Sequence, residues 1–174
     1  MRSLVGQLLE LVRDEPADTL AGDIWAAELG LGDDAPLRPT DPVVLRLFPD
    51  AYREDDEAAS DFRRFTERGL REAKASSAAT VLASLATAED DRGGPAKARE
   101  KVRIELDADQ AEAWLRTLTD MRLALGTRLG VSDGDEEDWI ALDVSDPRRH
   151  VHDVYEWLGW VQETLIRTLS ATLD

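Results

Sequence analysis

Apolar residues return every three or four positions along most of this chain, and no other feature constrains its fold as strongly. This spacing places them on one face of an α-helix, whereas a strand would need strict alternation. In the last helix expected, the inward-facing residues are Val151, Val154, Tyr155, Leu158, Val161, Leu165 and Leu169. The pattern predicts an all-α fold: a single helical-bundle domain over residues 1–174, with about five to six helices and at most one short strand.

Capping residues predict where these helices begin. Asp41 before Pro42 is typical of a helix start, because the carboxylate caps free N–H groups and proline suits the first turn. Asp107, with a glutamine three residues later, forms a capping-box pattern. Asp146 precedes a proline and predicts the start of the last helix. A further short helix is expected over residues 17–29.

Two connecting segments differ from the helical pattern. A Gly-Gly-Pro run inside a charged stretch predicts a mobile linker near residues 88–101. Strict alternation of apolar and polar residues predicts one short strand over residues 102–106. Because a lone strand leaves its edges unpaired, it needs a partner, either another segment or a second copy of the protein.

A long helix is predicted from residue 54 to about residue 85. Phe62 and Phe65 lie three apart on its apolar face, which we expect to point inward. Glu67 and Arg71 lie four apart and can form an ion pair on the solvated outer face. A break near residues 76–77 stays open. The expected core residues are Phe62, Phe65, Trp114, Leu118, Leu125, Tyr155, Leu158 and Leu165.

Charge and cysteine content exclude several classes of function. The chain has no cysteine, which excludes disulfides, thiolate metal sites and thiol nucleophiles. Its formal net charge is −16, which disfavours direct binding to DNA because DNA affinity comes largely from neutralising phosphates. Residues 1–52 hold 4 basic and 10 acidic side chains, and residues 131–153 hold 2 and 8, so each has a net charge of −6. No apolar run is long enough to span a membrane, and we expect a cytoplasmic protein.

Candidate metal and catalytic patterns fail on spacing. The acidic run at residues 133–138 has Asp138 where an EF-hand loop needs glycine, and we interpret it as a solvated loop. His150 and His152 point apart on a helix and have no third ligand motif nearby, so partly exposed histidines at a helix entry are favoured. No phosphate-binding loop, nucleophile elbow or zinc-protease motif is present, and we expect neither catalysis nor a cofactor.

Three motifs together resemble one actinobacterial family, described as a domain of unknown function and associated with the name oxidative-stress transcriptional regulator. The first is an acidic residue followed by Phe-Arg-Arg at residues 61–64. The second is Trp114 followed by the Arg-Leu-x-Leu-Gly-x-Arg-Leu run at residues 122–129. The third is a Trp-Leu pair at residues 157–158 with Gln-Glu at residues 162–163. The resemblance spans residues 1–172.

The resemblance implies a mostly helical cytoplasmic regulator that contacts other proteins, including a stress-responsive sigma factor. Redox sensing through cysteine, proposed within the family, cannot operate in this chain. Whether a second copy of the chain is also a partner, so that a homodimer forms, stays open. The alternative is a small-molecule-binding or catalytic domain that uses Arg and carboxylate residues near Phe62. The candidate interaction residues are Asp61, Phe62, Arg63, Arg64, Arg122, Arg128 and Trp157.

Overall fold

The computed structural model describes residues 1–13, 39–52, 54–90 and 103–173, and every regular element in these ranges is a helix. This confirms the predicted all-α fold. The expected helix at residues 17–29 lies outside the described residues. The helices are α1 (Arg2–Arg13), α3 (Pro42–Leu47), α4 (Asp56–Asp90), α5 (Ala108–Leu129), α6 (Glu136–Ala141) and α7 (Pro147–Leu173).

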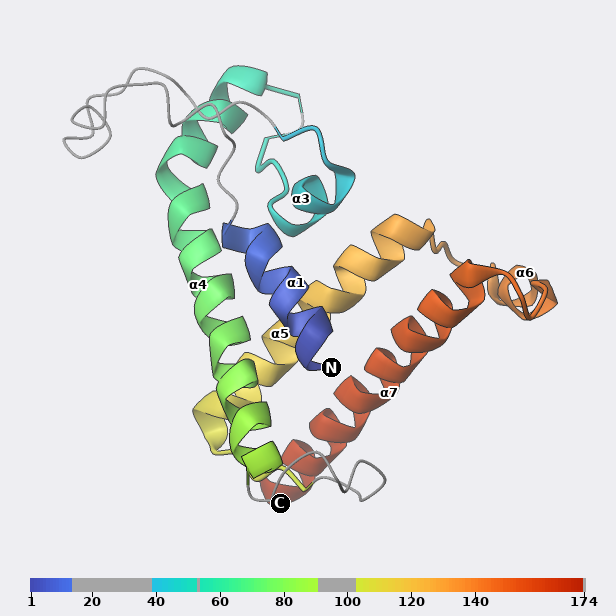
Figure 1. Ribbon diagram of the computed structural model, residues 1–174. Coiled ribbons are helices and arrows are strands. Elements are labelled where there is room, and N and C mark those ends of the chain that lie inside the picture. The colour runs from blue at the N-terminus through green and yellow to red at the C-terminus, as the bar shows by residue number, and fades with distance from the viewer. Residues whose placement is uncertain (14–38, 53, 91–102, 174) are drawn as a thin grey trace.

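Helix α5 is the centre of the bundle. It packs against α4, α7, α3 and, over a smaller area, α1. Helices α5 and α7 run antiparallel, with short α6 at the turn between them, and α1 lies between α4 and α5 (Figure 1). The bundle is therefore organised around one helix whose faces are shared among four neighbours.

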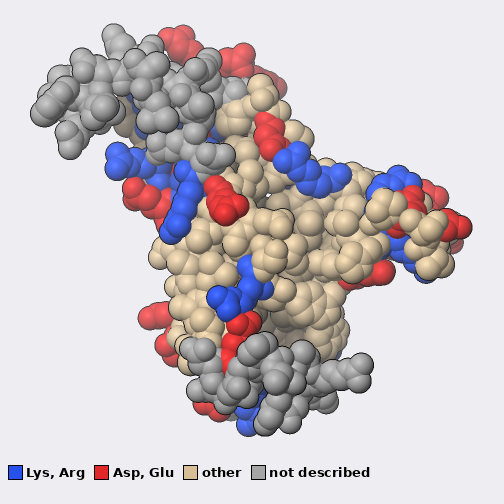
Figure 2. All heavy atoms as spheres, in the orientation of Figure 1, with Lys and Arg blue, Asp and Glu red and all other residues tan. Residues whose placement is uncertain are grey.

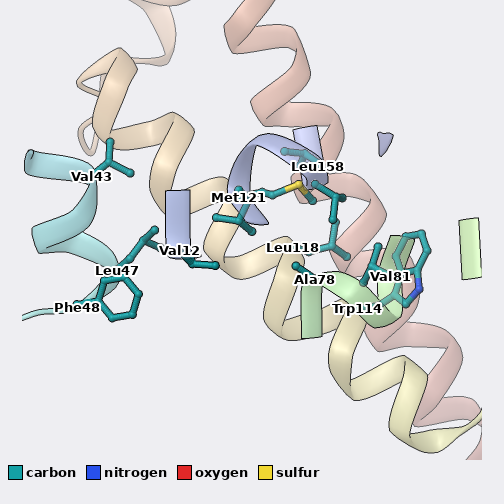
Figure 3. Close-up of a cluster of buried hydrophobic side chains, with 12 residues drawn as sticks. Val12, Val43, Leu47, Phe48, Ala78, Val81, Trp114, Leu118, Met121 and Leu158 are labelled. Carbon is teal, nitrogen blue, oxygen red and sulfur yellow. The ribbon is translucent and has the colours of Figure 1, made fainter. Parts of the chain in front are cut away.

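The core lies where α1, α3, α4, α5 and α7 converge (Figure 3). Of the core residues predicted from the sequence, Trp114, Leu118 and Leu158 are buried, which confirms them. Leu125, Tyr155 and Leu165 are half-buried. The buried apolar cluster consists of Val5, Leu8, Val12, Val43, Leu47, Phe48, Ala78, Val81, Trp114, Leu118, Met121 and Leu158.

The prediction that Phe62 and Phe65 belong to the core is wrong. Their exposed fractions are 43% and 75%. The face of α4 that turns inward in this region instead carries Arg63, Glu67 and Arg71, which are all buried. Charged side chains can occupy an interior when they neutralise one another and their hydrogen bonds are satisfied. Because these three side chains take the inward face of α4, both phenylalanines lie at the surface.

The predicted helix starts at Asp41 and Asp107 are confirmed. Asp41 accepts a hydrogen bond from the N–H of Val43 at 2.8 Å. Although partial burial raises its pKa, this bond and the Arg128 guanidinium lower the pKa of Asp41 below its ordinary value. Asp107 forms the complete capping box with Gln110, each accepting from the backbone N–H of the other. The carboxylate of Asp146 likewise accepts from a backbone N–H in the first turn of α7.

The connecting segments differ from expectation in several places. Residues 103–106 form no strand, and the described part of the chain holds no strand with which they could pair. Ile104 and Leu106 pack against the helical core instead. Helix α4 continues without a break past residues 76–77 and on to Asp90, so the first residues of the predicted linker are helical. Residues 91–101 lie outside the described residues. The acidic run at residues 133–138, interpreted as a loop, ends in the first turn of the short helix α6.

Candidate functional site

A buried network of four charged groups lies at the inward face of α4, three of them on α4 and the fourth, Asp50, in the turn after α3. Glu67 accepts hydrogen bonds from Arg63 and Arg71, each at 2.6 Å for the closest N–O pair, and Arg63 also binds Asp50 at 2.6 Å. The side chains of Arg63, Glu67 and Arg71 are at most 9% exposed. Burial opposes the charge of Arg63, yet its bonds to Asp50 and Glu67 outweigh that cost, and the pKa of Arg63 is raised. Two positive and two negative groups leave the network neutral.

This network ties three separate segments together. Arg71 donates to the backbone carbonyl of Val12 at 3.1 Å, near the end of α1, where helical carbonyls lack partners. Its guanidinium also lies 4.5 Å from the ring centroid of Phe48. Arg63 donates to the carbonyl of Phe48 at 3.2 Å. The network therefore fixes the turn after α3 and the end of α1 against α4.

The opposite, outward side of the same region is apolar and aromatic. We call Tyr52, Phe62, Phe65 and Leu70 the aromatic surface; their exposed fractions are 51%, 43%, 75% and 46%. Phe62 lies between the other two α4 residues, about 60° round the helix from Phe65 and about 80° from Leu70. Tyr52 and Phe62 meet edge to face, with ring centroids 6.2 Å apart. The Arg64 guanidinium lies 4.9 Å from the Phe65 ring centroid, a cation–π contact that holds both side chains at the surface.

Four of the candidate interaction residues lie in this region, but not on one face. Phe62 belongs to the aromatic surface, and Arg64 and Asp61 are exposed beside it, joined by a loose 4.0 Å ion pair. Arg63 points the other way into the network, because adjacent helical residues diverge by about 100°. Arg63 and Arg64 therefore do not face the same ligand.

The other three candidates lie on α5 and α7. Arg128 forms an ion pair with Asp41 at 2.6 Å, which links the end of α5 to the start of α3. Arg122 is half-buried between the two helices and donates to Gln162 at 3.1 Å, with its guanidinium 5.2 Å from the Tyr155 ring centroid. Trp157 is 42% exposed. No contact among the described residues joins these three to Asp61–Arg64.

The space around the candidate arginines is small. A hollow of about 20 Å³ lies between the turn after α3 and α4, beneath Phe62 and over Arg63. Small-molecule pockets usually have volumes of about 300–1,000 Å³. At Arg122, Gly159 allows close packing: a Cβ there would lie 3.5 Å from the guanidinium carbon. Arg63 thus lines only a small hollow, and Arg122 is packed against Gly159 and Tyr155.

The histidines and the acidic run show no metal site among the residues that the structure describes, because no group of three or more potential ligands comes together there. His150 is exposed, and His152 is half-buried against Trp139 with stacked rings 4.6 Å apart. Their expected position at the entry of the last helix is confirmed. None of the described helices has the length and apolar character needed to cross a bilayer.

The predicted Glu67–Arg71 ion pair is confirmed, but sequence reasoning placed it on the solvated face of α4 and missed the role of Asp50. A signal was present. When the apolar stripe of the second half of α4, at Ala78 and Val81, is extended backwards in steps of three and four, it leads through 74, 71, 67 and 63. That continuation carries charge, so periodicity based on apolar residues alone passes over it.

Comparison with known proteins places this chain in a family. Residues 1–169 match the family described as domain of unknown function DUF2017. The chain belongs to the DUF2017 family. It is also 30% identical to the oxidative stress regulator AosR of Mycobacterium tuberculosis (strain ATCC 25618 / H37Rv) and to that of Mycobacterium bovis, over 99% of this chain and 78% of each relative. The resemblance inferred from the three motifs is thereby confirmed.

No solved structure matches the chain. The buried network and the aromatic surface of this DUF2017 member are therefore described from this structure alone. The names of its relatives indicate a regulator.

Proposed function

We propose that this DUF2017 member is a non-enzymatic cytoplasmic regulator that acts by binding another protein through the aromatic surface of α4. By likeness to relatives named oxidative stress regulator, the partner we propose is a component of transcription, a stress-responsive sigma factor in particular. The observation that carries the proposal is the exposure of Tyr52, Phe62, Phe65 and Leu70 together.

Large exposed apolar side chains that cluster are typical of protein-binding surfaces. Aromatic residues dominate the energetics of such interfaces, because each covers a large area and loses little side-chain entropy on binding. Contacts with Tyr52 and Arg64 already hold Phe62 and Phe65, respectively. Beneath them the buried network fixes the turn that carries Tyr52. A surface ordered before binding loses less entropy when a partner docks.

The charge distribution favours a basic partner and disfavours nucleic acid. The two segments with a net charge of −6, residues 1–52 and 131–153, would attract a basic protein over roughly one screening length, about 8 Å at physiological salt. On α4 and α5 the arginines Arg68 and Arg116 pair with carboxylates four residues away. They are therefore poorly placed to neutralise phosphates.

A small-molecule site near Phe62 is less well supported. The hollow there, about 20 Å³, is less than a tenth of the volume usual for a ligand pocket. Arg63, the residue that would bind an anionic ligand, is already paired with Asp50 and Glu67. We therefore favour protein contact over ligand binding at this surface.

The proposal is tested by measuring the affinity of the purified chain for the stress-responsive sigma factors of its host. Phe65→Ser, at a side chain with only one ring contact, should weaken binding at least about tenfold, as expected for a central interface aromatic. Ile140→Ser is the matched control, since Ile140 is also 75% exposed but lies on α6. If Phe65→Ser binds as well as the parent chain, the aromatic surface is not the binding site.

A further inference from the structure

Helix α7 is covered on one side only. Of the described helices, α5 makes its extensive contacts, and of its described side chains Leu158 alone is fully buried. The side that faces α5 repeats in steps of four and three residues, which is coiled-coil spacing. This inner seam consists of Val151, Tyr155, Leu158, Gln162, Leu165 and Leu169. A helix of 27 residues thus leaves its opposite side without a partner in the described chain.

A second seam with the same spacing runs along that opposite side. Asp153, Trp157, Trp160, Thr164 and Arg167 follow one another in steps of four, three, four and three residues. Each lies two residues after a member of the inner seam, which turns it by about 200° to the outside. All five are exposed, and Trp157 and Trp160 remain 42% and 62% accessible. Two exposed tryptophans one turn apart are typical of an interface anchor.

The charges on this outer seam are symmetric about Trp160. Asp153 lies seven residues before it and Arg167 seven residues after it, each about 10.5 Å along the helix axis. Arg167 also pairs with Glu163 within its own helix, but both side chains are largely exposed (75% and 59%), so its guanidinium remains accessible to a second carboxylate. If a second α7 packs antiparallel with its two-fold axis at Trp160, Asp153 of one copy lies opposite Arg167 of the partner subunit. The two-fold axis generates the same contact a second time, with the two copies exchanged. One antiparallel arrangement therefore forms both ion pairs and brings the Trp160 side chains of the two copies together at the axis.

Net charge also favours α7 as the contact between copies. The chain as a whole carries −16, so most surfaces of two copies repel each other. Helix α7 holds three arginines and three acidic residues, which balance. On the face shown in Figure 2, uncharged side chains cover most of the middle of the molecule, interrupted by one basic and one acidic group, and charged side chains gather at the side where α6 lies.

We propose that this chain forms a homodimer through the outer seam of α7, with two antiparallel α7 helices and reciprocal Asp153–Arg167 pairs. The proposal does not depend on the partner-binding role of the aromatic surface, which lies on α4. A tryptophan buries up to about 250 Å², so the exposed parts of the two tryptophans supply roughly 500 Å² in the dimer. This is about a third of the 1,600 Å² that a standard interface buries in total. Because the tryptophans supply only part of such an interface, we expect a weak dimer with a dissociation constant in the micromolar range.

Sedimentation velocity of the full chain from about 1 to 200 µM tests this directly, since that range brackets micromolar dissociation. The parent chain should pass from monomer to dimer. Trp160→Glu should remain monomeric, because it places two carboxylates at the two-fold axis. A parent chain that stays monomeric throughout would overturn the proposal.

A charge-swap series tests the antiparallel geometry. Asp153→Arg should raise the dissociation constant at least about tenfold, because like charges then meet at two symmetric positions. Combining it with Arg167→Asp should return the constant to within about threefold of the parent value. A dimer that persists in Trp160→Glu, or a double variant that is no better than Asp153→Arg, would contradict this interface.

Two matched controls separate the seam from other effects. Glu137→Arg makes the same change in net charge on exposed α6, and Phe65→Glu makes the same aromatic-to-acid change on the aromatic surface. Both should leave dimerisation within about twofold of the parent chain. Circular dichroism establishes that each variant keeps its helical content. Loss of the dimer in either control would show that the outer seam is not the specific interface.

Discussion

Glu67→Gln removes one negative charge from the buried network and keeps the volume of the side chain. Glu67 bridges Arg63 and Arg71, each at 2.6 Å for the closest N–O pair. The neutral network then gains a net charge of +1. Removal of one partner from a buried ion pair costs about 3–5 kcal/mol, because the remaining charge stays desolvated. Arg63 keeps Asp50, and Arg71 keeps the Val12 carbonyl, so we expect the lower end, about 3 kcal/mol.

The same helix offers a matched control. Glu72 pairs with Arg68 four residues before it at 3.2 Å, but these side chains are 68% and 80% exposed. Glu72→Gln should therefore cost at most about 0.5 kcal/mol, as exposed pairs do. The two substitutions make the same chemical change on one helix and differ in burial and in the number of arginines paired, two for Glu67 and one for Glu72.

Urea unfolding followed by far-ultraviolet circular dichroism gives both free energies. A loss of 3 kcal/mol should also lower the melting temperature by about 6–12 °C for a domain of this size. If Glu67→Gln and Glu72→Gln cost the same within about 0.5 kcal/mol, the network is solvated in solution, and the account of how α4 is oriented fails.

Three further predictions follow from the fold and the charge. Asp107→Ala should cost about 1 kcal/mol through loss of the capping box, and an unchanged urea midpoint would place the start of α5 elsewhere. Trp114→Ala should cost about 3–5 kcal/mol, because this buried side chain also donates to Ser84 at 2.9 Å; a variant as stable as the parent in the same assay would remove Trp114 from the core. Titration against labelled duplex DNA at physiological salt should show no sub-micromolar binding, and tight binding by the isolated chain would restore a DNA-binding regulator.

Local signals in the sequence predicted local structure well. The caps at Asp41 and Asp107 and the entry to the last helix at Asp146 each depend on atoms within a few residues, so their chemistry can be read from the sequence. The inner faces of α5 and α7 follow largely apolar stripes, and Trp114 and Leu158 are buried as expected.

The orientation of α4 could not be predicted this way, because it depends on contacts between distant segments. Phe62 and Phe65 have the spacing of a buried face, and Arg63 and Glu67 look solvated. What reverses this is Asp50, which reaches the network across 13 residues of sequence. Asp50 adds a nonlocal partner to the local Arg63–Glu67 pair, and together they offset the cost of burying Arg63. The aromatic residues are then at the surface, and the candidate site appears where a core was expected.

The most direct test of the proposed function is photocrosslinking from the aromatic surface inside cells of the host. Benzoylphenylalanine in place of Phe65 keeps an aromatic ring at the side chain that is 75% exposed, and the same amino acid in place of Ile140 serves as the control. We predict that position 65 captures one defined protein, a sigma factor or another transcription component, which purified chain then binds and Phe65→Ser fails to bind. Equal capture from positions 65 and 140, or a captured protein whose binding is unaffected by Phe65→Ser, would contradict the account.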